Sequence, residues 1–162
     1  MPDPAQSRQV QLLEHVAARI KAVALAGVAD TSILVRKTPW NRNMTAPGLF
    51  VTPVTEQRSS TSLAGILATN ADVVIGYGAQ VSLIRASNEN LEVDDQWSLW
   101  RERAIGLFEP HYGAPAAAGL AWVETIEIEP GPALDSGAFA RGYDAQSFVV
   151  RAIGRRRRGE AA

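Results

Sequence analysis

The sequence predicts an α+β protein in which two helices pack on a mostly antiparallel β-sheet, in the order α-β-β-β-α-β-β with long loops. Two observations predict this class. Apolar residues recur at three- and four-residue spacing in two segments, as on one face of a helix, and they alternate with other residues in the remaining segments, as on strands. A length of 162 residues with 46% hydrophobic and 20% charged residues is typical of one folded domain with one core.

The first helix is predicted near the N-terminus. One apolar face is made by Val10, Leu13, Val16, Ala17, Ile20 and Val23. Ser7 is a suitable N-cap because its hydroxyl oxygen can accept a hydrogen bond from the first turn. Gly27 is the predicted end, since glycine takes the left-handed conformation at little cost.

Two short strands are predicted next, at Ser32 to Lys37 and at Gly48 to Val54, because both segments are rich in β-branched or aromatic residues and are bounded by Pro and Asn. Pro53 has no backbone N–H, so the second strand is expected to end there or to lie at a sheet edge. The polar segment Thr55 to Asn70 is predicted to be a long mobile loop.

A long strand is predicted over Val73 to Leu83, where apolar and other residues alternate without a break. Gly76 and Gly78 then lie on the same face of that strand. We expect this face to be bare, so that another backbone or a partner subunit can approach closely. The two glycines are therefore candidates for a subunit interface.

The second helix is predicted before Pro110, with Trp97, Trp100, Ala104, Leu107 and Phe108 on one face. The last two strands are predicted at Trp122 to Glu129 and at Ala145 to Ile153. In the first of these, Ile126 and Ile128 face the core, and Glu127 and Glu129 face solvent.

Charge is nearly balanced, with 16 basic and 17 acidic residues, which excludes a protein that binds nucleic acid chiefly through its overall charge. The distribution is uneven. Four arginines, Arg155 to Arg158, and one glutamate give the last eight residues a charge of +3 and leave −4 for the rest. We interpret residues 1–154 as one α+β domain and residues 155–162 as a basic C-terminal tail.

No catalytic, cofactor-binding or metal-binding residues are predicted. There is no cysteine and there are only two histidines, which excludes disulfide frameworks, thiolate metal sites and histidine-rich metal sites. The segment Met1 to Arg8 is too polar for a signal peptide, and no apolar stretch is long enough to span a membrane. We therefore expect no membrane association and a protein that begins in a cytoplasm.

A small-molecule enzyme or binding protein with an α+β fold is the alternative of another class. Its site would use Glu124, Asp135 or His111. The spacing of the carboxylates gives this enzyme hypothesis little support, because Glu124 and Glu127 fall on opposite faces of the predicted strand.

The order of elements resembles a known family. The opening helix (QLLEHVAARIKAV), the strands (ILVRK and DVVIGYGAQVSLIRA), the second helix (DQWSLWRERAIGLF) and the closing strands (VETIEIE and SFVVRAI) cover Gln9 to Ile153. In this order the chain is similar to tail-terminator and related neck proteins of long-tailed phages. Its final third, with IEPGP and FARGYD, also looks like uncharacterised proteins of phage-like gene clusters.

The resemblance implies a structural protein of the virion neck, assembled in the host cytoplasm. Such a protein forms a closed ring, commonly a hexamer in which the sheets of neighbours adjoin, and it needs no cofactor. The ring caps the tail tube, joins it to the head-completion proteins, and lets DNA pass without binding it specifically. A stopper or adaptor ring of the head-tail connector is the alternative within this class.

The charges fit such a ring. Ring closure joins two different patches on neighbouring subunits, and we expect Arg155, Arg156, Arg157 and Arg158 to form a basic arm for a neighbour. Glu127 and Glu129 are candidates for an acidic lumen, because a DNA conduit must repel the polymer that it passes.

Overall fold

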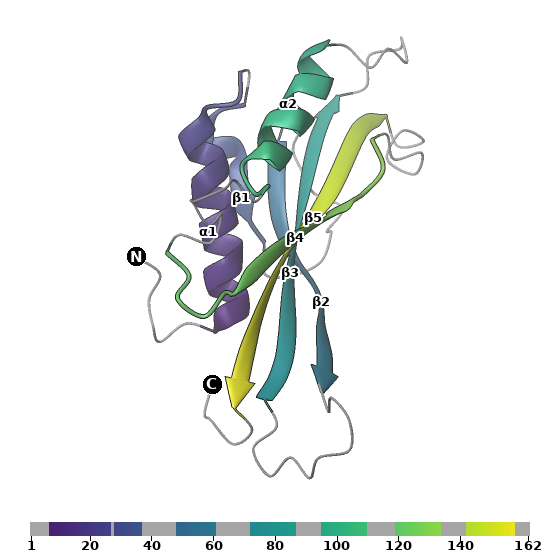
Figure 1. Cartoon of the computed structure of the whole chain (residues 1–162). Coiled ribbons are helices and arrows are strands. Elements are labelled where there is room, and N and C mark those ends of the chain that lie inside the picture. The colour runs from purple at the N-terminus through teal and green to yellow at the C-terminus, as the bar shows by residue number, and fades with distance from the viewer. Residues whose placement is uncertain are drawn as a thin grey trace.

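The structure is a computed structural model, and it describes residues 7–26, 28–36, 48–60, 72–86, 95–109, 119–133 and 142–157. The elements in chain order are α1 (Arg8–Val23), the short 3-10 helix η1 (Asp30–Ser32), β1 (Ile33–Val35), β2 (Gly48–Ser60), β3 (Asp72–Ala86), α2 (Asp95–Gly106), β4 (Thr125–Pro130) and β5 (Tyr143–Arg157). Figure 1 shows this arrangement. The predicted α+β class and the order α-β-β-β-α-β-β are confirmed.

The strands form one five-stranded sheet in the order β1-β2-β3-β5-β4. Only β1 and β2 are parallel, and the other three neighbouring pairs are antiparallel. The long strands β2, β3 and β5 run together, and their ends extend below α1 in Figure 1. The sheet is therefore longer than the helical layer that covers it.

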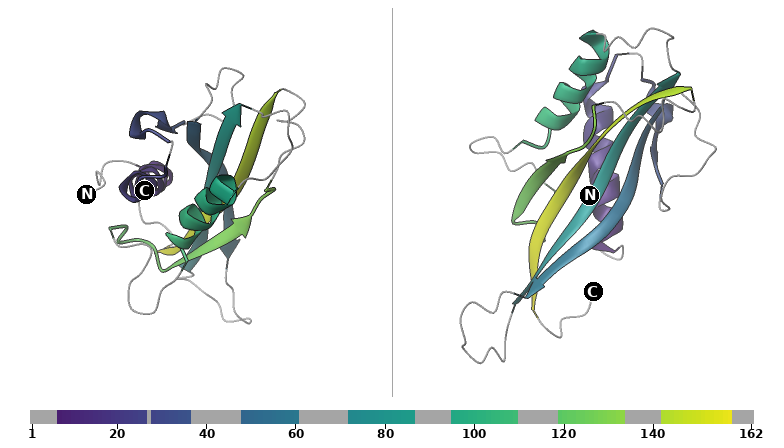
Figure 2. Two further views of the ribbon diagram at one scale, coloured as in Figure 1. Left: turned by 90° about the horizontal axis from the view of Figure 1, so that it is seen from above. Right: turned by 90° about the vertical axis from the view of Figure 1, so that its right-hand side faces the viewer.

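Both helices pack on the same face of the sheet. Alternate residues of the central strands, such as Val81 of β3 and Phe148 of β5, share one buried cluster with Leu13 and Ile20 of α1 and with Trp100 of α2. The right-hand view of Figure 2 shows the sheet from the side away from α1. We call this other side, on which Gly76, Gly78 and Arg151 lie, the helix-free face.

The start of α1 agrees with the prediction, and its end does not. Ser7 is the N-cap, and its hydroxyl oxygen accepts a hydrogen bond from the Val10 N–H at 3.4 Å. The helix stops at Val23 because Ala24 takes a left-handed conformation with φ of 50°. Gly27, the predicted stop, lies outside the described residues.

The second predicted strand continues past Pro53 to Ser60. The reason lies in β1, which pairs only with positions 49–51 of β2. The Val51 carbonyl accepts a hydrogen bond from the Arg36 N–H, so the backbone groups of Val51 point toward β1. The backbone groups of alternate residues in a strand point to the same side, so those of position 53 also point to this side, where β1 has already ended. The missing N–H of Pro53 therefore removes no ladder hydrogen bond, as the edge prediction requires.

The predicted loop Thr55 to Asn70 is wrong over residues 55–60, which belong to β2. The pairing of β2 with β3 shifts between Val54 and Gln57, where a bulge interrupts the ladder. The alternation that marks a strand is lost at such a bulge. Residues 61–70 of that prediction lie outside the described residues.

The basic tail predicted to begin at residue 155 also needs correction. Arg155, Arg156 and Arg157 are the last residues of β5, and they pair with Val74, Val73 and Asp72 of β3. The long β3 supplies backbone partners for these positions whatever side chains they carry. Arg158 and the residues after it lie outside the described part of the chain.

Two further boundaries differ. β4 begins at Thr125, three residues later than predicted, because Trp122 lies in a turn that crosses β5. A Cβ at Gly154 would overlap the Trp122 backbone, so this crossing requires glycine. The predicted core role of Trp100, Ala104 and Phe108 is confirmed, whereas the side chain of Trp97 lies outside the described residues.

Candidate interface on the helix-free face

The strand register brings several sequence-predicted residues together on the helix-free face. Gly78 of β3 is paired with Val54 of β2 and with Arg151 of β5, and Arg151 is paired with Glu127 of β4. These four residues form one row across the sheet. Gly76 lies two residues from Gly78, on the same face.

The glycine face is not bare, contrary to the prediction, because the Arg151 side chain lies over it. A Cβ on Gly76 would stand 3.3 Å from Arg151 Cδ, and a Cβ on Gly78 would stand 3.4 Å from an Arg151 guanidinium nitrogen. Both glycines are buried. They make room for an arginine of their own chain, and in the described structure their backbone is not open to a partner.

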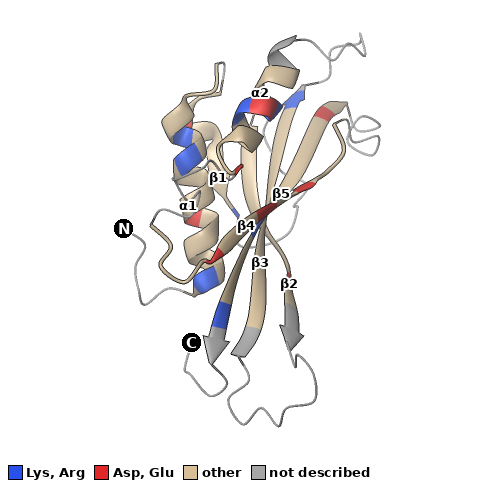
Figure 3. Ribbon diagram, viewed as in Figure 1, with Lys and Arg blue, Asp and Glu red and all other residues tan. Residues whose placement is uncertain are grey.

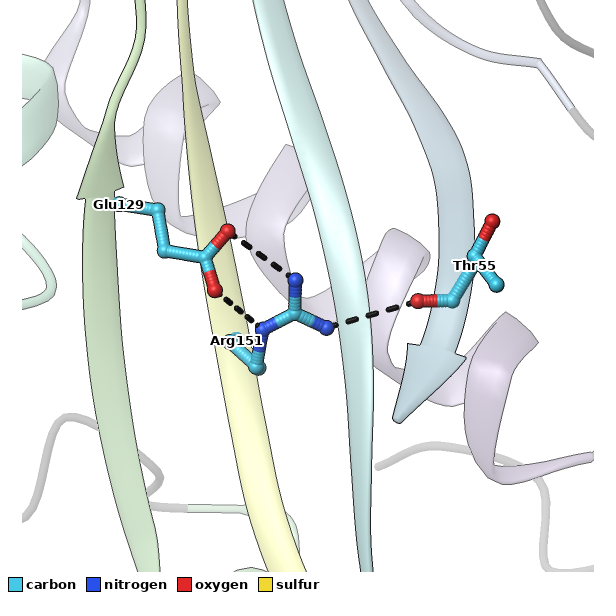
Figure 4. Close-up of polar contacts among 3 residues, drawn as sticks. All are labelled: Thr55, Glu129 and Arg151. Atoms are coloured by element: carbon cyan, nitrogen blue, oxygen red, sulfur yellow. Dashed lines mark hydrogen bonds and ion pairs between the residues drawn. The ribbon is translucent and has the colours of Figure 1, made fainter. Parts of the chain in front are cut away.

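Arg151 is itself 95% buried and is held from both sides (Figure 4). Its Nε donates to Glu129 Oε1 at 2.6 Å and one terminal nitrogen donates to Oε2 at 3.0 Å, which is the bidentate geometry that arginine favours. The other terminal nitrogen donates to the Thr55 carbonyl oxygen at 3.5 Å. One side chain thus links β4 to the bulge in β2 across two intervening strands.

The ion pair changes the electrostatics of both partners. Hydrogen bonds from Arg151 lower the pKa of Glu129, against the opposing effect of its partial burial. The bonds to Glu129 raise the pKa of Arg151, with a smaller contribution from Glu127. Glu129 is therefore an ionised carboxylate paired with Arg151, and of the two lumen candidates Glu127 is the exposed one.

Aliphatic side chains surround the ion pair on the helix-free face. They are Val54 of β2, Val74 of β3, and Val149 and Ile153 of β5, all of them half-buried. Thr125 and Glu127 of β4 are exposed beside them. An apolar surface of this kind with a polar border is typical of a protein contact.

Figure 3 shows a basic (blue) segment of β5 just before its arrowhead. Arg155 Nε lies 3.2 Å from Glu124 Oε2, with 62% and 52% of the two side chains exposed. A pair so exposed contributes little to stability. In the backbone register, Arg155, Arg156 and Arg157 are opposite Val74, Val73 and Asp72 of β3.

Sequence reasoning missed two clusters that hold the helices to the sheet. Arg101 of α2 donates to the carbonyl oxygens of Gly131, Ser147 and Pro132 at 2.7, 2.9 and 3.5 Å, and burial lowers its pKa. The Trp122 indole N–H donates to Gln11 of α1 at 3.1 Å. The only sequence signals are an arginine and a tryptophan beside apolar residues.

The Trp122 ring is enclosed on two sides. The Tyr77 ring meets it at 82° with centroids 5.4 Å apart, and the Arg8 guanidinium lies 5.7 Å from its centroid. These contacts join α1, β3 and the turn before β4. They anchor the turn, and we assign them no ligand.

Of the three residues named for the alternative enzyme, only Glu124 lies within the described part of the chain. Glu124 is exposed and paired with Arg155, whereas His111 and Asp135 lie outside the described residues. Over the described ranges there is no group of three His, Cys, Asp or Glu residues that could hold a metal ion. In the same ranges no helix is long and apolar enough to cross a membrane.

The fold is an α+β protein whose sheet is covered by helices on one face. On the other face a second cluster, Phe50, Ile84 and Ala145, is buried, and the part around Arg151 carries an aliphatic and acidic surface. In comparisons with known proteins, no family model matches the sequence. No curated protein matches it either.

Proposed function

We propose that the protein is a structural protein of the neck of a long-tailed phage or phage-like particle. In this role it forms a hexameric ring that terminates the tail tube and joins it to the head-completion proteins. The observation that carries the proposal is the part of the helix-free face around Arg151, where aliphatic side chains are half-buried and no described helix covers them. The helix-free face combines half-buried Val54, Val149 and Ile153 with exposed Glu127, and such a face is suited to a partner subunit.

The order of elements gives separate support. The resemblance to tail-terminator and neck proteins rests on an α-β-β-β-α-β-β order, and the structure has that order. A shared order is an argument by analogy, because one fold can serve many functions. The proposal therefore needs a direct test of assembly.

The surfaces also fit a ring. A closed ring with one subunit type needs two unlike patches that meet head to tail. The aliphatic and acidic part of the helix-free face supplies one such patch, and we expect the basic C-terminal segment from Arg155 to Arg158 to supply the other. Glu127 is available for a lumen that repels DNA, and DNA passes through the ring without specific binding.

Electron microscopy of the purified protein, alone and mixed with the tail tube protein of its own gene cluster, tests the proposal. We expect rings with sixfold symmetry that cap one end of the tubes. Rings that cap no tube, but that bind the portal or another connector ring, favour a stopper or adaptor. A protein that forms no ring and binds no tube in either experiment contradicts the proposal.

A further inference from the structure

The end of β2, after its bulge, has no apolar residue that could fix its pairing with β3. Residues 57–60 read QRSS. A strand segment that is polar on both faces specifies its register weakly, because a shift by one residue moves no apolar group out of a core. In the observed register Gln57 is opposite Gly76 and Ser60 is opposite Val73. This register therefore needs another determinant.

The bulge makes two registers possible for this segment. Between the pairs Val54–Gly78 and Gln57–Gly76, β2 has two residues and β3 has one. Without the bulge, β2 would continue in a regular ladder, and residues 57–60 would be paired one residue out of step with the observed register. A shift of one residue reverses the face on which every side chain of a strand lies.

Arg151 supplies a fixed reference for β2. The pairing of β3 with β5 runs without a shift from Asp72 to Ala86, so Arg151 keeps its place relative to β3. The two hydrogen bonds to Glu129 of β4 orient the guanidinium. Gly78 leaves the space that the guanidinium occupies, since a Cβ there would stand 3.4 Å from Arg151 Nη1.

The guanidinium meets the bulge at the Thr55 carbonyl oxygen, which accepts a hydrogen bond from Arg151 Nη1 at 3.5 Å (Figure 4). In a regular ladder the backbone carbonyls lie near the plane of the sheet and point to neighbouring strands. The Thr55 carbonyl instead accepts from a side chain that lies over the helix-free face, so the bulge has turned it out of that plane. The bond therefore belongs to the bulged register.

We propose that Arg151 selects the register of the end of β2, because its bond to the Thr55 carbonyl stabilises the bulged pairing against the pairing that is one residue out of step. Arg151 is a positioning residue in this role, since it acts on residues 57–60 through the bulge. The charge of the guanidinium strengthens its bond to the carbonyl. The inference goes beyond the proposed function and does not depend on it, because all of these contacts lie within one chain.

Crosslinking of introduced cysteines reports the register directly, because the chain has no cysteine of its own. In the observed register Ser60 is opposite Val73, so Ser60→Cys with Val73→Cys should form a disulfide. In the shifted register position 59 would be opposite position 73, so Ser59→Cys with Val73→Cys reports that state. Electrophoresis without reducing agent separates crosslinks within one chain from those between chains.

Arg151→Met is expected to raise the yield of the 59–73 crosslink relative to the 60–73 crosslink by about tenfold, the factor that corresponds to one charge-assisted hydrogen bond. Glu129→Gln should move this ratio in the same direction by less. Arg85→Met is the matched control, because it removes an ion pair between β3 and β5, from Arg85 to Asp144, that does not involve the bulge. Circular dichroism verifies that each variant is folded.

An unchanged crosslink ratio in Arg151→Met overturns the inference. An equal change in Arg85→Met also overturns it, since the sheet would then have loosened as a whole. Where Arg151→Met does not fold, Glu129→Gln decides in its place, and an unchanged ratio there overturns the inference as well.

Deletion of Glu56 gives a complementary test. It removes the extra residue of β2, so Gln57 can stay opposite Gly76 without a bulge. The 60–73 crosslink should then form equally well with and without Arg151→Met. A crosslink that still depends on Arg151 in the shortened chain would contradict a role that acts through the bulge.

Discussion

Arg151 accounts for the two glycines and for the ion pair on the helix-free face. Its side chain needs the space above Gly76 and Gly78, and its charge needs Glu129. A lone arginine in an apolar strand (FVVRAI) predicts a carboxylate on a neighbouring strand, and Glu129 stands there. The pair of glycines is visible in the sequence, but what fills their space depends on the register between β3 and β5, which no local pattern specifies.

Replacement of Gly78 by alanine is expected to destabilise the fold by about 1 to 3 kcal/mol, because the new methyl group overlaps the Val54 side chain. Chemical denaturation measures the loss. The double variant with Val54→Ala should recover part of it. Gly106→Ala is the control, since a Cβ there meets nothing within 4 Å and alanine favours the helix. Equal effects at positions 78 and 106 would contradict the packing account.

Replacement of Glu129 by glutamine is expected to cost about 1 to 2 kcal/mol at neutral pH, because buried Arg151 loses its carboxylate partner. The figure is modest because 46% of the Glu129 side chain is exposed and screened by water.

The loss of stability caused by Glu129→Gln should depend on pH. The pKa of Glu129 lies below its ordinary value of 4.5 in the folded state, so the ion pair stabilises the fold fully above that pH. The stabilisation is lost as the pH falls through the lowered pKa. Urea unfolding at several pH values should therefore show the gap between wild type and Glu129→Gln closing in acid, whereas a constant gap would argue against the assigned pair.

At the scale of elements, backbone pairing determines the strand ends that the side-chain patterns did not predict. The interiors of α1, β3 and β5 follow their apolar periodicity, and the sequence predicts them. The ends of β2 and β5 are polar or basic, and they are strands because β3 is long enough to pair with both. A pattern of buried and exposed residues cannot reveal strand ends that extend beyond the helical layer.

The attachment of α2 gives a prediction at this scale. Arg101→Lys should loosen α2 from the sheet, because lysine lacks the planar fork that reaches the Gly131 and Ser147 carbonyls together. We expect a loss of about 1 to 2 kcal/mol and faster hydrogen exchange in α2. Arg103→Lys, at an exposed position of the same helix, should change neither quantity. Unchanged exchange in Arg101→Lys would refute this role.

At the scale of the whole molecule, the half-buried aliphatic side chains and exposed Glu127 on the helix-free face are the features that support assembly. The composition shows that the positive charge is concentrated near the C-terminus. The strand register places Arg155–Arg157 at the end of β5 and exposed Glu127 on β4. The predicted basic arm is in part a strand end.

The molar mass of the wild-type protein, measured by light scattering alone and with tail tubes present, tests the central claim most directly. The account predicts a particle of six chains, alone or on the end of a tail tube. A monomer at every concentration and salt level, with tubes or without them, would contradict it.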